Sequence, residues 1–313
     1  MRAVIWTPPW LARAYARLYA SIGTNTFDYS EAGPILELSD KRLIATTLAK
    51  LRTFGHLTVR RDPTDPRRKL FKLIDPQSTV LAMAIQSRAK TNGITEKLRV
   101  ASSILGYYVN GAYAAYQFHR YSAAGSMDIS VRPDQLPTWI ALVSEPMVAL
   151  SIDDVPAERP AETNVHLRSD FDEKLSEHAR VIDGIRFLAP EVLVVSGITK
   201  EYPSLEDVLA ILVVRRAELD WKKLLELSQV YNATRFVGCV LDVLNFEARK
   251  PLFEKSLIGK LFRLSNLGAR LDFPASMKSQ PTERLYENIS SKWNLRLRLA
   301  HALVSKIVTD LVR

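Results

Sequence analysis

SDKRLIATTLAKLRTFGHLTVRRDPTDPRRKLFKLI, residues 39–74, is the stretch that decides the fold of the N-terminal part of this chain. Three apolar residues in its first half recur at helical spacing, namely Ile44, Leu48 and Leu51. This spacing predicts a helix over Asp40–Phe54 with one buried face, and Ser39 is the expected N-cap. Gly55 follows, as is common at a helix C-terminus, so the helix is expected to end there.

The second half of the stretch predicts a two-stranded ribbon. Short apolar runs lie on either side of a turn with the sequence Pro63, Thr64, Asp65 and Pro66. Apolar runs separated in this way are typical of a strand, a tight tip and a returning strand.

Charge sets this helix and ribbon apart from the rest of the chain. Residues 41–72 contain ten basic side chains against two acidic ones, a net charge of +8, whereas the whole chain carries +9. The basic side chains are Lys41, Arg42, Lys50, Arg52, Arg60, Arg61, Arg67, Arg68, Lys69 and Lys72. A basic helix followed by an arginine-rich ribbon suits duplex DNA, because a helix fits the major groove while a ribbon reaches phosphates or the minor groove. A solvated basic hairpin without a nucleic-acid role is the alternative interpretation.

The ribbon also resembles a known family. The run LTVRRDPTDPRRKLFKLIDP, residues 57–76, is similar to the wing of MarR-type winged-helix regulators. The resemblance implies that the helix over 40–54 is the recognition helix. It also implies that Asp65 and Arg67 pair at the wing tip, with Arg68 beside them. The side chains expected to contact DNA or support that contact are Arg42, Thr46, Lys50, Arg60, Arg61, Asp65, Arg67, Arg68 and Lys69.

Two further helices are expected before this stretch. One follows the prolines Pro8 and Pro9, and a shorter one lies around 30–38. With three helices and a ribbon, residues 1–76 are predicted to form a winged helix-turn-helix domain. Residues 77–103 have a helical pattern, which fits either a connector or a dimerisation helix.

The segment YYVNGAYAAYQFHRYSAAGSMDISV, residues 107–131, resembles the opening of the nucleotidyltransferase fold, with a strand, a glycine turn, a helix and a second strand. In such enzymes two carboxylates on alternate positions of one strand bind magnesium, because period-two geometry places both on one side. Here Asp128 is followed two positions later by Ser130, and Asn110 stands where a small residue belongs. The resemblance therefore implies a nucleotidyltransferase-like scaffold without a working metal site. A plain core helix and strand is the alternative.

The elements beyond residue 131 resemble a second family. The pattern predicts strands over 138–143, 147–152 and 165–167, an Asp-Gly turn at 183–184, and helices that begin near Ser204, Asp220 and Ala233. Their order, taken from 104 to 246, loosely resembles the C-terminal domain of AbiEi-type antitoxins. Those proteins pair that domain with an N-terminal winged helix and repress their own toxin-antitoxin operon. The resemblance implies a cognate toxin as a protein partner.

Composition excludes several other classes of protein. The single cysteine, Cys239, excludes an internal disulfide framework, and the five histidines show no metal-ligand spacing. Neither a Walker-type loop nor a dinucleotide fingerprint is present. The longest apolar run, 208–214, is far short of the roughly 20 residues that a membrane span requires, so a cytoplasmic location is expected. A net charge of +9 favours an anionic partner.

Together these patterns predict an α+β protein of four consecutive parts. These are a winged helix-turn-helix domain (1–76), a helical connector (77–103), a nucleotidyltransferase-like α/β domain (104–248) and a basic helical tail (249–313). The tail carries +5 over its first basic run, which is either a solvated helix face or a second nucleic-acid-facing patch.

The predicted function is a DNA-binding transcriptional regulator without enzymatic activity or cofactor, an antitoxin-like autorepressor. Two alternatives remain open. One is a nucleotidyltransferase that uses Asp128 as a metal ligand. The other is a MarR-like repressor released by a small molecule. Winged-helix regulators usually dimerise to read two half-sites, yet such a chain could also act as a monomer, so the sequence leaves both a homodimer and a monomer open.

Overall fold

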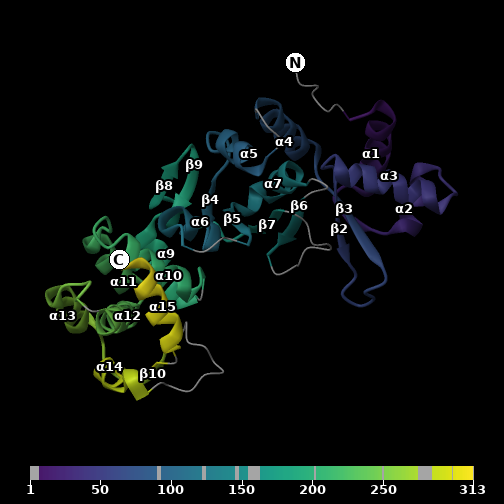
Figure 1. Ribbon diagram of the computed structural model, residues 1–313. Coiled ribbons are helices and arrows are strands. Elements are labelled where there is room, and N and C mark those ends of the chain that lie inside the picture. Colours follow the sequence, from purple (N-terminus) through teal and green to yellow (C-terminus); the bar gives the residue numbers. More distant parts are fainter. Residues whose placement is uncertain are drawn as a thin grey trace. The chain divides into compact units, whose positions relative to one another are not determined.

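The computed structural model describes residues 7–89, 93–121, 125–144, 148–153, 163–200, 202–248, 250–273, 284–297 and 299–312. Its elements define an α+β protein with mixed sheets (Figure 1). The helices are α1 (Pro9–Ile22), α2 (Tyr29–Leu36), α3 (Lys41–Thr53), α4 (Pro76–Arg88), α5 (Ile94–Ala101), α6 (Gly111–His119), α7 (Leu136–Val143), α8 (Glu173–Ser176), α9 (Pro190–Lys200), α10 (Leu205–Val214), α11 (Trp221–Val230), α12 (Thr234–Glu247), α13 (Lys255–Leu264), α14 (Glu287–Lys292) and α15 (His301–Leu311). The strands are β1 (Thr26–Phe27), β2 (Leu57–Arg61), β3 (Lys69–Leu73), β4 (Tyr107–Asn110), β5 (Met127–Val131), β6 (Val148–Ile152), β7 (Thr163–Arg168), β8 (Ala179–Ile182), β9 (Ile185–Leu188), β10 (Leu271–Asp272) and β11 (Leu295–Arg296).

The chain forms two compact units. The first comprises residues 1–108, 129–172 and 181–186, and the second comprises 109–128, 173–180 and 187–313. Each unit is built from separate stretches of sequence, so its limits differ from the four consecutive parts expected from the sequence. That four-part division stays a prediction.

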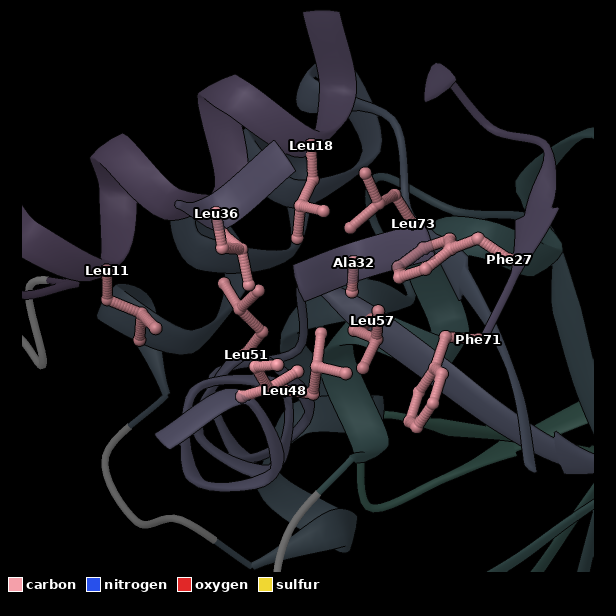
Figure 2. Close-up of a cluster of buried hydrophobic side chains, with 11 residues drawn as sticks. Leu11, Leu18, Phe27, Ala32, Leu36, Leu48, Leu51, Leu57, Phe71 and Leu73 are labelled. Carbon is pink, nitrogen blue, oxygen red and sulfur yellow. The ribbon is translucent and has the colours of Figure 1, made fainter. Parts of the chain in front are cut away.

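The N-terminal helices and sheet share one hydrophobic core (Figure 2). β3 lies between β1 and β2 and is antiparallel to both. The buried members of the core are Leu11, Leu18, Phe27, Ala32, Leu36, Ile44, Leu48, Leu51, Leu57, Phe71 and Leu73. The predicted apolar face of α3 is confirmed, since Ile44, Leu48 and Leu51 are all among them. Side chains from all three helices and from both long strands therefore hold the helices against the sheet.

The start of α3 corrects one expectation. The helix begins at Lys41, and the side chain of Asp40 accepts the backbone N–H of Arg42 at 2.8 Å. Asp40 is therefore the N-cap, and the assignment of that role to Ser39 was wrong. An aspartate next to the first helical residue satisfies one of the free N–H groups and also places its negative charge at the positive end of the helix dipole.

α2 is capped more completely than α3. The Asp28 carboxylate accepts the backbone N–H groups of Ser30 and Glu31, while the Glu31 carboxylate accepts the backbone N–H of Asp28. This reciprocal arrangement is a capping box, which fixes where α2 starts.

The larger sheet has the strand order β6-β7-β5-β4-β9-β8, with β4 parallel to β9 and β6 parallel to β7. The predicted strand, helix and strand over 107–131 are confirmed as β4, α6 and β5. The Asp-Gly turn joins β8 to β9, and both of its residues have positive φ, 51° at Asp183 and 79° at Gly184. Positive φ at both positions is the backbone of the tight hairpin turn that this dipeptide favours.

The strand predicted over 138–143 was wrong, because these residues belong to helix α7. All six of them are buried. A short, uniformly apolar run has no alternation with which to distinguish a strand from a buried helix. Pro137, in the first turn of α7, suits a helix start since its fixed φ is already helical. α4, in the stretch predicted as a connector or dimerisation helix, packs against α7.

The C-terminal helices follow the predicted starts. Ser204 caps α10 and Asp220 caps α11, each through a side-chain acceptor. Cys239 is a buried free thiol, and burial raises its pKa. The short parallel pair β10 and β11 was not predicted. No helix among the described residues is long and apolar enough to cross a bilayer.

Candidate nucleic-acid interface

α3 turns one face to the core and the other to solvent. Arg42, Thr46 and Lys50, the residues expected to contact bases, are all exposed. The hydroxyl of Thr46 donates to the carbonyl of Arg42 at 2.8 Å, so its proton is used within the helix. The exposed face of α3 therefore has the predicted residues on it, but the hydroxyl proton of Thr46 is not available to a partner.

Lys50 has a neighbour that sequence reasoning missed. Its ammonium group lies over the ring of Trp10, 5.0 Å from the centroid, in a cation–π contact. Trp10 is 41% exposed and belongs to α1, forty residues away along the chain. The tryptophan holds the lysine charge near the solvent-facing side of α3. No local pattern in the sequence could have indicated this contact.

The β2–β3 ribbon aligns two cations directly across from each other. The register pairs Arg61 with Lys69, and both side chains are exposed. Like charges at directly opposed positions of an antiparallel pair repel and are destabilising. Arg60, opposite Leu70, is exposed on the other face of the ribbon. A polyanion that contacts this ribbon would relieve the repulsion.

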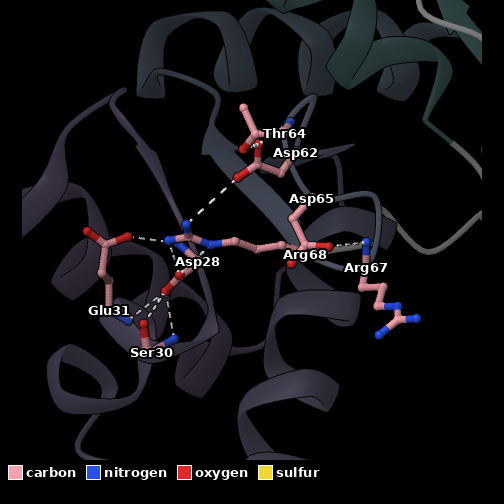
Figure 3. A network of polar contacts seen from close by, with 8 residues as sticks. All are labelled: Asp28, Ser30, Glu31, Asp62, Thr64, Asp65, Arg67 and Arg68. Carbon is pink, nitrogen blue, oxygen red and sulfur yellow. Dashed lines mark hydrogen bonds and ion pairs between the residues drawn. The ribbon is translucent and has the colours of Figure 1, made fainter.

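Two aspartates shape the tip of the ribbon (Figure 3). Asp62 accepts the backbone N–H and the hydroxyl of Thr64, at 2.9 and 2.7 Å. Asp65 accepts the backbone N–H of Arg67 at 3.0 Å. The hydrogen bonds from Thr64 lower the pKa of Asp62, so it remains ionised. Both carboxylates thus hold the loop closed, and the Arg67 side chain points away from the network into solvent.

Arg68 is the tip arginine that makes the ion pair. Its Nε donates to Asp28 at 2.9 Å, and its Nη2 donates to the same carboxylate oxygen. Asp62 lies 3.7 Å from Nη1. Asp28 is only 9% exposed, and its pKa falls to about 2, mainly through the hydrogen bond from the Ser30 hydroxyl, with Arg68 adding to the effect against the opposing influence of burial.

This geometry corrects the expected Asp65–Arg67 pair. Asp65 binds the backbone of Arg67, while the guanidinium that is paired belongs to Arg68 and its partner lies outside the ribbon, at the N-cap of α2. The Asp-x-x-Glu spacing at 28–31 would have indicated the capping box, but not the partner forty residues away. The Asp28–Arg68 pair ties the ribbon tip to α2.

The remaining expected cations have no ion-pair partner within the described part of the chain. These are Arg42, Arg60, Arg61, Arg67 and Lys69. All five are exposed. Residues 41–72 contain ten basic side chains and only two acidic ones, so α3 and the ribbon keep a strong excess of positive charge.

Asp128 lies elsewhere, on β5, and is 3% exposed. Ser130, two residues further along the strand, donates its hydroxyl to Asp170 at 2.7 Å. A serine thus stands where a second carboxylate would face the same side of the strand. Among the residues that the structure describes, no group of three histidine, cysteine, aspartate or glutamate side chains is arranged to hold a metal ion.

Neither a protein-family model nor a curated protein matches this chain. One solved structure that resembles it is the crystal structure of RV2827C protein from Mycobacterium tuberculosis, with 14% sequence identity and a TM-score of 0.41. The alignment covers 98% of this chain and 96% of that one. At this TM-score the likeness carries no conclusion about fold or function.

Proposed function

We propose that this chain is a transcriptional regulator that binds double-stranded DNA through a winged helix-turn-helix formed by residues 9–73. The element order α1, β1, α2, α3, β2, β3 supports this proposal, together with a sheet in which β3 lies between β1 and β2. In this reading α3 is the recognition helix and the β2–β3 ribbon is the wing.

One observation carries the proposal. Five exposed cations on α3 and the wing have no ion-pair partner in the described part of the chain, and Arg61 faces Lys69 across the ribbon despite their repulsion. A solvated hairpin would be more stable with opposite charges at those two positions. Phosphate groups spaced along a duplex supply the missing negative charge, so DNA is the partner that this surface suits best.

The proposed mechanism is repression by occlusion of a promoter. Arg42, Thr46 and Lys50 would lie along the base edges of the major groove. The ribbon cations Arg60, Arg61, Arg67 and Lys69 would neutralise phosphates or enter the minor groove. Arg68 and Asp65 support the wing rather than contact DNA. We further propose that the regulator is antitoxin-like, controls its own operon and uses the rest of the chain for a cognate toxin, with a homodimer reading two half-sites.

Salt dependence of binding tests this proposal. Fluorescence anisotropy with a labelled duplex, measured between about 50 and 200 mM salt, gives the number of phosphate contacts from the slope of log K against log salt. The double variant Arg61→Ala/Lys69→Ala is expected to reduce that slope by about 2. Lys222→Ala is the control, since Lys222 on α11 has a side chain that is 88% exposed and lies in the second unit. Equal affinity and slope in the wild type and double variant would refute the wing assignment.

The nucleotidyltransferase alternative has less support. Its chemistry needs a second carboxylate beside Asp128, and Ser130 occupies that position with its hydroxyl bound to Asp170.

A further inference from the structure

The outer face of α3 has small and apolar side chains next to the cations Arg42 and Lys50. Successive residues of an α-helix are rotated by about 100°, so Arg42, Thr46, Ala49 and Thr53 lie on the side opposite the buried stripe. All four are exposed. Leu43 borders this face and is 53% exposed. Leu43 and Ala49 thus add apolar surface to the exposed side of α3, within the most basic stretch of the chain.

The two threonines add methyl groups rather than hydroxyl donors to this face. The hydroxyl of Thr46 donates to the Arg42 carbonyl at 2.8 Å, and that of Thr53 donates to the Ala49 carbonyl at 3.0 Å. A hydroxyl has one proton to donate, and in both residues the helix backbone receives it. What each threonine offers to a partner is therefore chiefly its methyl group. Together with Leu43 and Ala49 they form a strip of apolar groups, with Arg42 as its guanidinium donor.

The major groove contains one apolar group, the C5-methyl of thymine. An α-helix fits that groove, and small side chains allow its backbone to approach the base edges closely. We infer that α3 reads thymine methyl groups, with Leu43 as a specificity-determining residue and Ala49 and the threonine methyls beside it. This inference rests on the proposed function, and it names the base feature that the recognition helix distinguishes.

Replacing thymine by uracil tests the inference, because uracil lacks only the 5-methyl group. A binding site is first selected from a random duplex library with the full-length chain, and each thymine of the enriched site is then replaced singly by deoxyuridine. At one or more positions the wild-type affinity is expected to fall about fourfold, the effect of losing one buried methylene-sized group. Leu43→Ala should abolish the difference between thymine and uracil at one of those positions while retaining binding.

Val80→Ala is the matched control, since Val80 is 65% exposed on α4 and loses a similar apolar surface. It should leave the thymine preference unchanged. Alanine is a stronger helix former than leucine and Leu43 is largely exposed, so Leu43→Ala is expected to fold, which circular dichroism checks.

The outcomes separate the two levels of the argument. If the chain binds no duplex in the selection, the proposed function fails. If it binds an enriched site tightly but tolerates uracil at every thymine, DNA binding stands and the thymine readout is overturned. A thymine preference that survives unchanged in Leu43→Ala would overturn the role of that residue.

Discussion

The Asp28–Arg68 pair allows a sharp test, because the proposed function assigns different roles to the neighbouring arginines at the ribbon tip, DNA contact to Arg67 and support of the fold to Arg68. Asp28→Ala removes the N-cap of α2, which costs about 1 kcal/mol. It also removes the carboxylate that accepts from Arg68, and this second loss is moderate because the freed guanidinium can in part bind water instead. We expect the free energy of unfolding of the first compact unit, which contains both residues, to fall by about 2 kcal/mol. At a typical urea dependence of about 2 kcal/mol per M, the midpoint of urea unfolding moves down by about 1 M.

Asp28→Asn separates the two contributions. Asparagine caps a helix about as well as aspartate, so this variant keeps the cap and loses the charge that faces Arg68. Its destabilisation should be smaller than that of Asp28→Ala and should vanish when Arg68 is already alanine, which a double-mutant cycle measures.

The DNA-binding readout completes this test. Arg67→Ala is expected to leave the urea midpoint unchanged while it weakens duplex binding and lowers the salt slope by about 1. Arg68→Ala is expected to lower the urea midpoint and the hydrogen-exchange protection of the ribbon. If Arg67→Ala destabilised the protein as much as Arg68→Ala, the assignment of these two arginines to binding and architecture would be refuted.

Three further predictions address other sites. Burial lowers the pKa of His56 to about 4, so the unfolded chain binds an extra proton below about pH 6.5. The stability that neutral His56 contributes is complete above pH 6.5, and about 3 kcal/mol of it is lost as the pH falls to 4. Urea unfolding of His56→Gln should show a smaller loss of stability over that pH range. An equal loss in the variant would show that His56 is not its source. Gly111→Ala should destabilise the protein by at least about 1 kcal/mol, because φ is +64° and an added Cβ would lie 2.0 Å from the Tyr202 hydroxyl oxygen. Gly125 has open space around it, so the control Gly125→Ala should leave thermal unfolding unchanged. With magnesium and labelled nucleoside triphosphates the wild type should transfer no nucleotide to RNA or protein, and turnover that Asp128→Ala abolished would establish the enzymatic alternative.

The sequence predicted those elements whose signals are local. The apolar spacing of α3, the Asp-Gly turn between β8 and β9 and the caps Ser204 and Asp220 each depend on a few adjacent residues. A strand predicted from local apolar residues was wrong at 138–143, which is helical, since a run of buried apolar residues fits a strand and a buried helix equally well. The missing information there is which elements pack on both sides, and a short stretch of sequence does not contain it.

The candidate site shows the same limit. Its cations were evident from composition, but their roles depend on contacts between distant residues. Arg67 and Arg68 are adjacent and chemically identical, yet only Arg68 reaches Asp28, because the tip turn directs one guanidinium towards α2 and the other into solvent. Likewise Lys50 was expected to be a simple base contact, and the neighbouring Trp10 ring comes from α1. Residue type predicted the chemistry of the surface, and the fold determined which side chains are available for it.

Arg68 forms an ion pair that orders the ribbon tip and is therefore not available to contact DNA. This use of an arginine is consistent with the proposed binding role of the ribbon. A two-stranded ribbon alone is marginally stable in water, and its tip would sample many orientations. Ordering such a tip upon binding would reduce affinity, because the lost conformational freedom must be offset by new contacts. The Asp28–Arg68 pair and the two aspartate-capped turns order the tip beforehand and link it to α2, which precedes α3 by only a short turn. Helix α3 and the ribbon are thereby held in one arrangement. Under the proposed function, phosphate contacts from Arg67 would then position base contacts from α3.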